Sequence, residues 1–336
     1  MNEKGRRTYY VVCPANLKSG GPELLHQLVF SLNKQGAEAH IVYTNIKSGQ
    51  DPTPTDFDSY ISSYKLFTEI PDIPGSVIIL PETRIDLLKK FKHTDVYIWW
   101  MSIDNYLDVY SPKRIYKQFG VKSVLSYLLR AKWRFAIPFL KKQSIHHLAQ
   151  SQYAIDFLTE RHITNVRYLS DYVNRSYVDA SAQTVINNQR NNVVLYNPKK
   201  GLAFTERLIQ AEPDITWVPL INLTTSEVKQ KLLTSKVYVD FGSHPGKDRF
   251  PREAAILGCC IITGKRGSAR NSVDIPIPDT YKFDDQTESI DVIIKRIKFC
   301  LDDFESASDS FRKYRRIIAN EYTRFNQDVS NIFLQN

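Results

Sequence analysis

Short apolar runs alternate with helical patterns along most of this 336-residue chain. In the first half the runs predict strands at 8–13, 39–43, 66–69, 77–80, 96–100, 146–149 and 166–169. In the second half they predict strands at 192–196, 215–220, 237–241 and 260–263. Helical patterns separate them, at 23–35, 84–91, 122–142, 152–161, 202–211 and 252–257. Because the strand runs are continuously apolar, we expect parallel sheets with helices on both faces, which is an α/β fold.

One polar stretch interrupts this alternation. Residues 172–192 lack a strong hydrophobic period, so we place a linker at 173–191. It separates an N-terminal domain, 1–172, from a C-terminal domain, 192–310, and we expect a helix at 311–336 to pack back on the N-terminal domain. We therefore predict two Rossmann-like domains that face each other across a cleft, with ligands at the carboxyl ends of the strands.

Composition excludes several classes of protein. Hydrophobic residues make up 42% of the chain, which suits a globular protein, and no apolar run approaches the roughly 20 residues that span a bilayer. The first strand follows the N-terminus directly, with no cleavable apolar stretch, so we do not expect secretion. The four cysteines form no metal-type pair. Buried, reduced thiols in a cytoplasmic protein are the expectation.

Residues 237–258, VYVDFGSHPGKDRFPREAAILG, predict an anion-binding site. An apolar strand leads into a glycine-containing loop with Lys247, Arg249 and Arg252, and a short helix begins near Pro251. Glycine allows close approach to a phosphate, and the free N–H groups of the helix end point toward it. Glu253, in the first turn, can accept hydrogen bonds from ribose hydroxyls. The implied ligand is a nucleoside diphosphate that carries a further group; the alternative is a solvated basic loop.

The net charge of +9 is concentrated in one segment. Residues 110–155 contain no Asp or Glu and hold nine cations, interleaved with apolar and aromatic side chains. A basic, aromatic-rich helical segment of this kind suits an anionic membrane surface. The alternative is an internal helix whose cations face the cleft and bind phosphate. Nucleic acid is not the expected partner, because no nucleic-acid motif accompanies the segment.

Four sequence motifs resemble glycosyltransferases of the GT-B architecture, in particular the family 4 group that builds bacterial surface polysaccharides. SGGPELLHQLVFSLNKQGAEAHIVY resembles the first strand–loop–helix of that group, where a glycine pair faces the diphosphate. LYNPKKG is similar to the strand that ends in a basic residue and a Lys-Gly pair. PREAAILGCCIIT resembles the Glu-Ala helix with its following strand, and GKRGSARN occupies the place of the next small-residue loop.

The resemblance implies roles for individual residues of the donor site. Lys200 would meet the diphosphate of the sugar donor, Glu253 would bind the ribose, and Gly20 and Gly21 would close on the sugar or the phosphate. The phosphate roles of Lys247, Arg249 and Arg252 rest on charge alone.

Three further residues are candidates for donor contacts. His244 is expected to contact the sugar or the phosphate, with a plain turn residue before Pro245 as the alternative. Gly267 and Ser268 are expected to line the donor site through their backbone, with an ordinary tight loop as the alternative.

Two positions depart from the family pattern. The family often has a second glutamate eight positions before Glu253, where this chain has Pro245. Many members also place a histidine in the loop that here reads WWMSIDNYL. In that loop Asp104 is the candidate general base toward an acceptor hydroxyl, and Asn105 would orient the sugar or the acceptor. The alternative for Asp104 is a helix cap.

We therefore expect a cytoplasmic glycosyltransferase of the hexosyltransferase type, peripheral on the inner face of the plasma membrane. Its donor is a UDP or GDP sugar, and its acceptor is a saccharide or lipid-linked hydroxyl in surface polysaccharide synthesis. No cofactor and no metal are expected, because several cations can neutralise the departing diphosphate. The alternatives are a catalytically silent nucleotide-sugar-binding or scaffold protein, and a nucleotide-sugar epimerase or hydrolase of the same fold.

Overall fold

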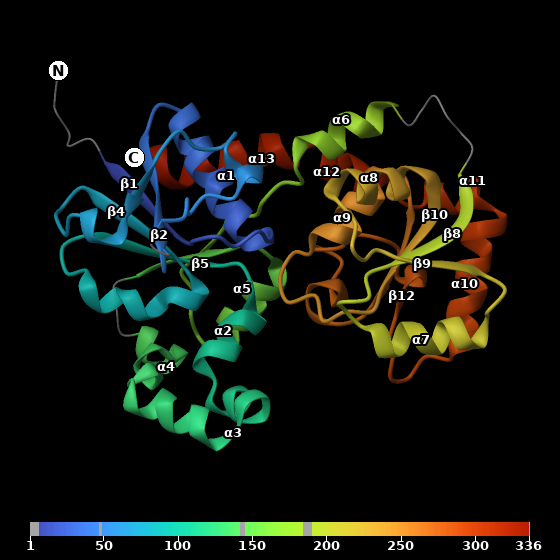
Figure 1. The fold of residues 1–336 in the computed structure, drawn as a ribbon, viewed down its shortest axis with the longest axis horizontal. Helices are drawn as coiled ribbons and strands as arrows, with labels where there is room; N and C mark the ends of the chain where they lie inside the picture. Colours follow the sequence, from blue (N-terminus) through green and yellow to red (C-terminus); the bar gives the residue numbers. More distant parts are fainter. Residues whose placement is uncertain (1–6, 47–48, 142–144, 184–189, 336) are drawn as a thin grey trace. The chain divides into compact units, whose positions relative to one another are not determined.

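The structure is a computed structural model that describes residues 7–46, 49–141, 145–183 and 190–335. The chain divides into two compact units (Figure 1). The N-terminal unit comprises Met1–Asp171 and Arg324–Asn336, and the C-terminal unit comprises Tyr172–Thr323. Each unit has one parallel sheet with its own hydrophobic core.

The N-terminal unit contains a seven-stranded sheet in the order β3-β2-β1-β4-β5-β6-β7. Every described pair of neighbouring strands is parallel. The strands are β1 (Thr8–Pro14), β2 (Glu38–Thr44), β3 (Tyr64–Leu66), β4 (Ser76–Pro81), β5 (Asp95–Trp100), β6 (His146–Ala149) and β7 (Val166–Tyr168). Val11, Ile79 and Ile98 are fully buried in three central strands. This burial agrees with the continuous apolar runs, since helices cover both faces of such a sheet.

The helices of this unit lie between the strands in the sequence. They are α1 (Gly20–Lys34), α2 (Ile103–Tyr110), α3 (Pro112–Leu129), α4 (Ile137–Leu140) and α5 (Gln152–Thr159). Short 3-10 turns are η1 (Thr55–Phe57), η2 (Phe67–Glu69), η3 (Glu82–Lys90) and η4 (Lys132–Phe135). No helix among the described residues is long and apolar enough to cross a membrane.

The C-terminal unit contains a five-stranded sheet in the order β12-β11-β10-β8-β9. The strands are β8 (Asn191–Tyr196), β9 (Thr216–Pro219), β10 (Ser235–Asp240), β11 (Cys260–Gly264) and β12 (Lys282–Phe283), and all described pairs are parallel. The helices are α6 (Arg175–Gln183), α7 (Leu202–Ala211), α8 (Thr225–Thr234), α9 (Arg249–Ile256), α10 (Ile290–Asp302), α11 (Phe304–Asp309) and α12 (Arg312–Ala319), with 3-10 turns η6 (Gly267–Arg270) and η7 (Asp279–Tyr281). All four cysteines of the chain are buried free thiols.

The C-terminal end of the chain returns to the N-terminal unit. Helix α13 (Glu321–Val329) crosses the boundary between the units and continues into η8 (Ser330–Leu334). Asn326 accepts a hydrogen bond from the Ser31 hydroxyl at 2.6 Å, and the Tyr9 hydroxyl donates to the carbonyl of Phe333 at 2.7 Å. The segment 311–336 is not the single helix that was expected, because α12 ends at Ala319 and a separate helix, α13, begins at Glu321.

Some expected elements differ from those observed. The expected strand at 66–69 is mostly the turn η2, because the Glu69 carboxylate accepts the backbone N–H of Leu66 and closes the chain on itself. The expected helix at 122–142 is the last part of α3, which begins at Pro112, is kinked at Gly120 and ends at Leu129. The left-handed backbone of Ala131, with φ 50°, stops it there. Part of the expected linker is helix α6, and Val173 and Tyr177 belong to the core of the C-terminal unit. Residues 184–189 of that linker lie outside the described residues.

Candidate functional site

Three loops of the C-terminal unit meet at the carboxyl ends of their strands. They are the β8 loop (197–201), the β10 loop (241–248) and the β11 loop (265–271). Gly201, with φ +65°, has no room for a side chain, because a Cβ would lie 2.4 Å from the carbonyl carbon of Phe241. Gly267, with φ +51°, is equally confined, because a Cβ would lie 2.0 Å from the carbonyl oxygen of His244. Both glycines are therefore needed for the loops to approach one another.

Ser268 joins the β11 loop to the β10 loop. Its backbone N–H donates to the carbonyl of His244 at 2.9 Å, and its hydroxyl donates to the carbonyl of Gly246 at 2.6 Å. The side chain of Ser268 is fully buried. Gly267 and Ser268 thus hold the loops together, and the donor contact expected of their backbone stays a prediction.

A buried cluster of charges lies at the centre of these loops. We call it the His244 cluster, and it consists of Lys200, Asp240, His244 and Asp248. His244 Nδ1 lies 2.9 Å from Asp248 Oδ2, and its Nε2 lies 3.5 Å from Asp240 Oδ1. The Lys200 ammonium donates to Asp248 Oδ1 at 2.8 Å. The bond between Lys200 and Asp248 therefore joins the β8 loop to the β10 loop, and His244 contacts the carboxylates at both ends of the β10 loop.

The electrostatics of this cluster favour charged side chains. Burial alone would lower the pKa of His244, but the carboxylates of Asp240 and Asp248 outweigh burial and raise that pKa. Burial would also raise the pKa of Asp248, yet His244 and Lys200 outweigh it and hold the pKa of this carboxyl below its ordinary value. His244, with φ 45°, adopts a left-handed backbone that few residues other than glycine adopt. These contacts compensate for that conformation.

The same cluster has the spacing of a metal site. One ligand atom from each of Asp240, His244 and Asp248 lies within 4.8 Å of the others. However, the Lys200 ammonium is bonded to Asp248, and a cation adjacent to this carboxylate opposes the binding of a metal cation. The residues present therefore fit an internal ion network better than a metal centre.

A second charged cluster supports the start of helix α9. The Arg252 guanidinium donates to Glu321 Oε2 at 2.9 Å, and the Lys247 ammonium lies 2.9 Å from Glu321 Oε1. Arg252 also donates to the carbonyls of Lys247 and Asp248, and its side chain is fully buried. Glu321 accepts the backbone N–H of Val173 as well. A phosphate contact by Arg252 would require its guanidinium to leave these partners.

The other expected donor residues lie on α9 and on the β8 loop. Helix α9 begins at Arg249, two residues before Pro251, so Arg249 and Glu253 lie one turn apart on the same face. Glu253 is mostly buried. The side chain of Lys200 is 35% exposed, compared with 9% for Lys247. Lys200 therefore keeps access to solvent while it is held by Asp248.

Gly20 and Gly21 form the first turn of helix α1 rather than a loop. Their helix begins after Ser19, and neither glycine has a positive φ. A Cβ on Gly21 would lie 3.8 Å from the Met101 methyl group, which is ordinary van der Waals contact. The free N–H groups of this helix end are the feature that could meet an anion.

Asp104 and Asn105 lie in the first turn of helix α2. Ser102 is the helix cap, since its hydroxyl accepts the backbone N–H of Asn105 at 3.2 Å. Asp104 accepts a charge-assisted hydrogen bond from Arg114 at 2.5 Å, and Asp108 accepts one from the same guanidinium at 3.1 Å. Asp104 is half-buried and Asn105 is exposed. The helix-cap role considered for Asp104 belongs to Ser102.

Two buried carboxylates, one after strand β4 and one at the start of helix α13, were not among the expected site residues. Glu82 follows β4, is fully buried, and accepts the backbone N–H of Met101 at 3.1 Å. Burial raises the pKa of Glu82 to about 7. Glu321, which binds Arg252, lies 69 positions further along the chain. No local sequence pattern connects Arg252 with a residue so distant. The position of Glu82 directly after an apolar strand, in contrast, was a usable signal for a candidate site residue.

Known proteins resemble this chain in structure and not in sequence. No protein-family model matches the sequence, and no curated protein matches it significantly. HepE of Anabaena, solved in complex with UDP-glucose, is 12% identical and has a TM-score of 0.62, with 96% of this chain and 98% of that chain covered. Sucrose-phosphate synthase from Thermosynechococcus elongatus is 10% identical, with a TM-score of 0.65 and 98% of each chain covered. WaaG, a glycosyltransferase involved in lipopolysaccharide biosynthesis, is 10% identical, with a TM-score of 0.58, and 97% of this chain and all of that chain are covered.

These structures match almost the whole chain, including both parallel sheets. The chain has the GT-B fold. The α/β prediction of two Rossmann-like domains is thereby confirmed. At such low identity, the likeness establishes the GT-B fold and leaves the chemistry to be argued from the residues.

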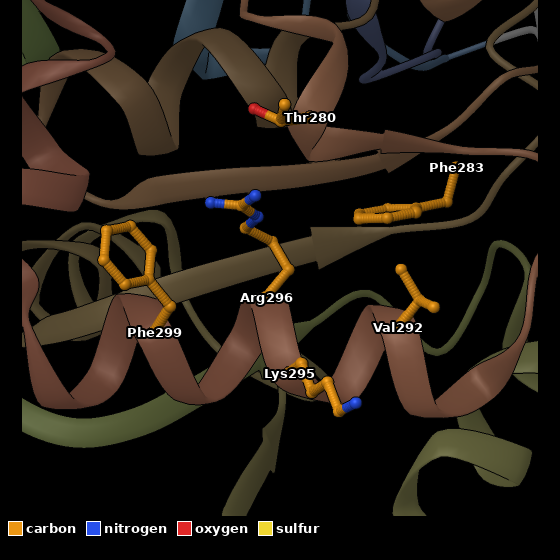
Figure 2. A pocket seen from close by; sticks show the side chains of 6 residues that line it. All are labelled: Thr280, Phe283, Val292, Lys295, Arg296 and Phe299. Carbon is orange, nitrogen blue, oxygen red and sulfur yellow. The ribbon is translucent and has the colours of Figure 1, made fainter.

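The C-terminal unit of this GT-B chain also has an open groove beside α10, which Figure 2 shows. Its volume is about 450 Å³, and it is lined by Thr280, Phe283, Val292, Lys295, Arg296 and Phe299. The Arg296 guanidinium lies over the ring of Tyr281, 4.9 Å from its centroid. No residue expected in the donor site lines this groove. It adjoins the β11 loop, because the backbone N–H of Lys265 donates to the carbonyl of Phe283 at 2.8 Å, but residues outside the three loops line it.

Proposed function

We propose that this protein is a glycosyltransferase that transfers a sugar from a nucleoside diphosphate to a hydroxyl group of a glycan or a lipid-linked saccharide. The observation that carries this proposal is the meeting of the β8, β10 and β11 loops at the carboxyl ends of their strands. That is the place where open α/β sheets bind their ligands. The side chain of Lys200, which is 35% exposed, lies in this place.

The donor diphosphate would be bound by Lys200 and Arg249. A lysine offers a point charge to a phosphate, and Asp248 holds this one in position. Glu253, one turn after Arg249 on α9, would accept the ribose hydroxyls. UDP and GDP sugars are the proposed donors, and the UDP-glucose complex of HepE supports the choice of UDP.

Lys247 and Arg252 would support this site rather than contact the donor. Their shared partner Glu321 fixes both cations, and their positive charge still lies close to the β10 loop. Their field would help to neutralise the departing nucleoside diphosphate without direct contact. We propose on this basis that the reaction needs no metal. Transfer that is unchanged in EDTA is the expected result, and loss of transfer that Mg²⁺ restores would contradict it.

We propose that the N-terminal unit provides the acceptor side of the reaction. Asp104 is the proposed general base and Asn105 the proposed acceptor ligand, while the N–H groups at Gly20 and Gly21 would face the sugar or the phosphate. Arg114 holds Asp104 in one orientation, which a general base needs. We propose surface polysaccharide synthesis as the context, at the cytoplasmic side of the membrane.

A catalytically silent nucleotide-sugar-binding protein is the second candidate. Pro245 in place of the family's glutamate favours it. The two candidates differ in donor turnover. An enzyme of this type releases nucleoside diphosphate slowly from UDP-glucose or a GDP sugar by hydrolysis without acceptor, and an accepting glycan increases the rate.

The test follows that release by coupled detection of UDP and GDP, with Asp104→Asn as the catalytic variant. Asp156→Asn, an exposed position on α5, is the matched control. The enzyme is supported if Asp104→Asn lowers the rate of nucleoside diphosphate release at least tenfold and Asp156→Asn leaves that rate unchanged. Binding of a nucleotide sugar with no release under any condition supports the silent protein.

A further inference from the structure

Helix α3 exposes an unusual number of apolar side chains. Seven exposed large hydrophobic residues lie between positions 116 and 133: Tyr116, Phe119, Val121, Leu125, Leu128, Leu129 and Trp133. Leu129 is 80% exposed and Val121 is 68% exposed. Six of the seven lie on α3, and Trp133 lies in η4. Single exposed apolar residues are normal on a protein surface, but such a group on one helix indicates a binding surface.

The group has a helical order. The helix is kinked at Gly120, and after this kink Val121, Leu125, Leu128 and Leu129 follow the i, i+4, i+7, i+8 spacing of one face. A different face attaches the helix to the unit, because Tyr127 is buried and its hydroxyl donates to the carbonyl of Tyr110 at 3.1 Å. The apolar stripe is therefore directed away from the core. Figure 1 shows α3 and α4 at the outer edge of the N-terminal unit.

Cations surround this stripe. Lys113, Lys117, Lys122 and Arg130 are exposed, and within the described part of the chain none of them has an ion pair. Arg114 differs, because Asp104 and Asp108 of α2 neutralise it and fix the start of α3. The span 110–155 contains no acidic residue. The surface is thus both apolar and uniformly positive.

We propose that the part of α3 after Gly120 lies on an anionic lipid surface, with the four apolar side chains among the acyl chains and the cations against headgroup phosphates. This combination of an apolar stripe and flanking cations fits a lipid interface, where long cationic side chains extend to the phosphates. A second copy of the chain fits less well, since a two-fold contact would place the same positive charges opposite one another. The inference does not depend on glycosyl transfer, because membrane binding is measured without turnover.

The experiment is flotation of the full chain with vesicles of phosphatidylcholine and phosphatidylglycerol, compared with phosphatidylcholine alone. Binding to the anionic vesicles that weakens with rising salt is expected. The variant Lys122→Glu with Arg130→Glu, which changes two exposed cations after Gly120, should reduce binding roughly tenfold or more, because each cation near such a surface contributes substantially. Its matched control is Lys89→Glu with Lys92→Glu, which makes the same change of charge on exposed residues of the same unit.

The apolar stripe has its own pair of variants. Leu125→Ser with Leu129→Ser should also lose vesicle binding, whereas Leu66→Ser with Ile73→Ser, at similarly exposed positions, should keep it. Since all these side chains are exposed, unfolding temperatures should remain close to that of the unmodified chain.

Three results would overturn the proposal. The first is that the unmodified chain does not float with anionic vesicles at any salt. The second is a dimer, seen by light scattering, that Leu125→Ser with Leu129→Ser makes monomeric while vesicle binding is absent. The third is retention of an RNA oligonucleotide that depends on Lys122 and Arg130, without vesicle binding.

Discussion

Lys200 combines two properties that a phosphate-binding residue needs. Its ammonium is held by Asp248, so little side-chain freedom is lost when a ligand binds, and the side chain is still 35% exposed. Arg252 has the first property without the second, because its guanidinium is fully buried against Glu321. Among these cations, exposure rather than charge decides which one can reach a donor.

The first prediction concerns Lys200. At an effective dielectric constant of about 20, a cation near 4 Å from a phosphate contributes about 4 kcal/mol, and the partial exposure of Lys200 reduces this contribution. Lys200→Ala should therefore weaken the binding of UDP or GDP by roughly tenfold. Isothermal titration measures the change, and Lys199→Ala, an exposed neighbour on the same loop, should leave it unaffected. Equal effects of the two substitutions would place the diphosphate elsewhere.

The second prediction concerns Gly267. An alanine there meets both a left-handed φ of +51° and a contact of 2.0 Å with the carbonyl of His244. Gly75→Ala is the control for conformation alone, since its φ is +91° and nothing lies within 4 Å. Gly75→Ala should lower the free energy of unfolding by about 1–2 kcal/mol. Gly267→Ala should lower it clearly more, as measured by chemical unfolding. Equal losses for the two variants would show that the β11 loop adapts.

At the scale of elements, the β10 loop and α9 show what a local pattern can predict. The sequence correctly predicted a strand, a loop and a short helix between residues 237 and 258, because apolar runs, glycines and Pro251 are local signals. It did not predict that Glu321 would bind Lys247 and Arg252, because that contact joins distant elements. The cationic side chains of the loop were predicted to bind the donor, but in the structure Lys247 and Arg252 contact Glu321.

The third prediction follows from the pKa of His244. Asp240 and Asp248 raise this pKa in the folded state, so the stabilisation by the charged imidazole is complete below the unfolded pKa of about 6.5. It is lost as the pH rises through the higher, folded-state pKa. The stability advantage of the unmodified chain over His244→Gln should therefore shrink as the pH rises above about 7. Urea unfolding across this range tests it, with exposed His93→Gln as the control.

The fourth prediction concerns the second charged cluster. Glu321→Gln leaves two buried cations, Arg252 and Lys247, without their carboxylate partner. Removing one partner of a buried ion pair typically costs about 3–5 kcal/mol. We expect Glu321→Gln to lower the free energy of unfolding by that amount, as measured by urea unfolding. Glu288→Gln, at an exposed position of the same unit, should change this free energy negligibly. A loss below about 1 kcal/mol, the range of a surface ion pair, would show that the cluster is hydrated.

At the scale of the whole molecule, the parallel sheets could be predicted because strands buried on both faces must be apolar throughout. The elements that were mispredicted are controlled by single residues or contacts. The bond from Leu66 to Glu69 converts an expected strand into a turn, and the left-handed Ala131 ends the expected helix 122–142 after Leu129. The site was predictable to the level of loops, since strand ends and glycines show where a sheet binds ligands. Which cation remains accessible depends on packing, which no single segment encodes.

The most direct test of the account is hydrogen exchange of the full chain, measured by mass spectrometry with and without saturating UDP or GDP. The account predicts protection of backbone amides in the β8, β10 and β11 loops and in the first turn of α9. Peptides of α10 that line the groove, including Val292 and Phe299, should exchange at an unchanged rate. Protection confined to that groove, or absent from the three loops while UDP or GDP is bound, would contradict the account.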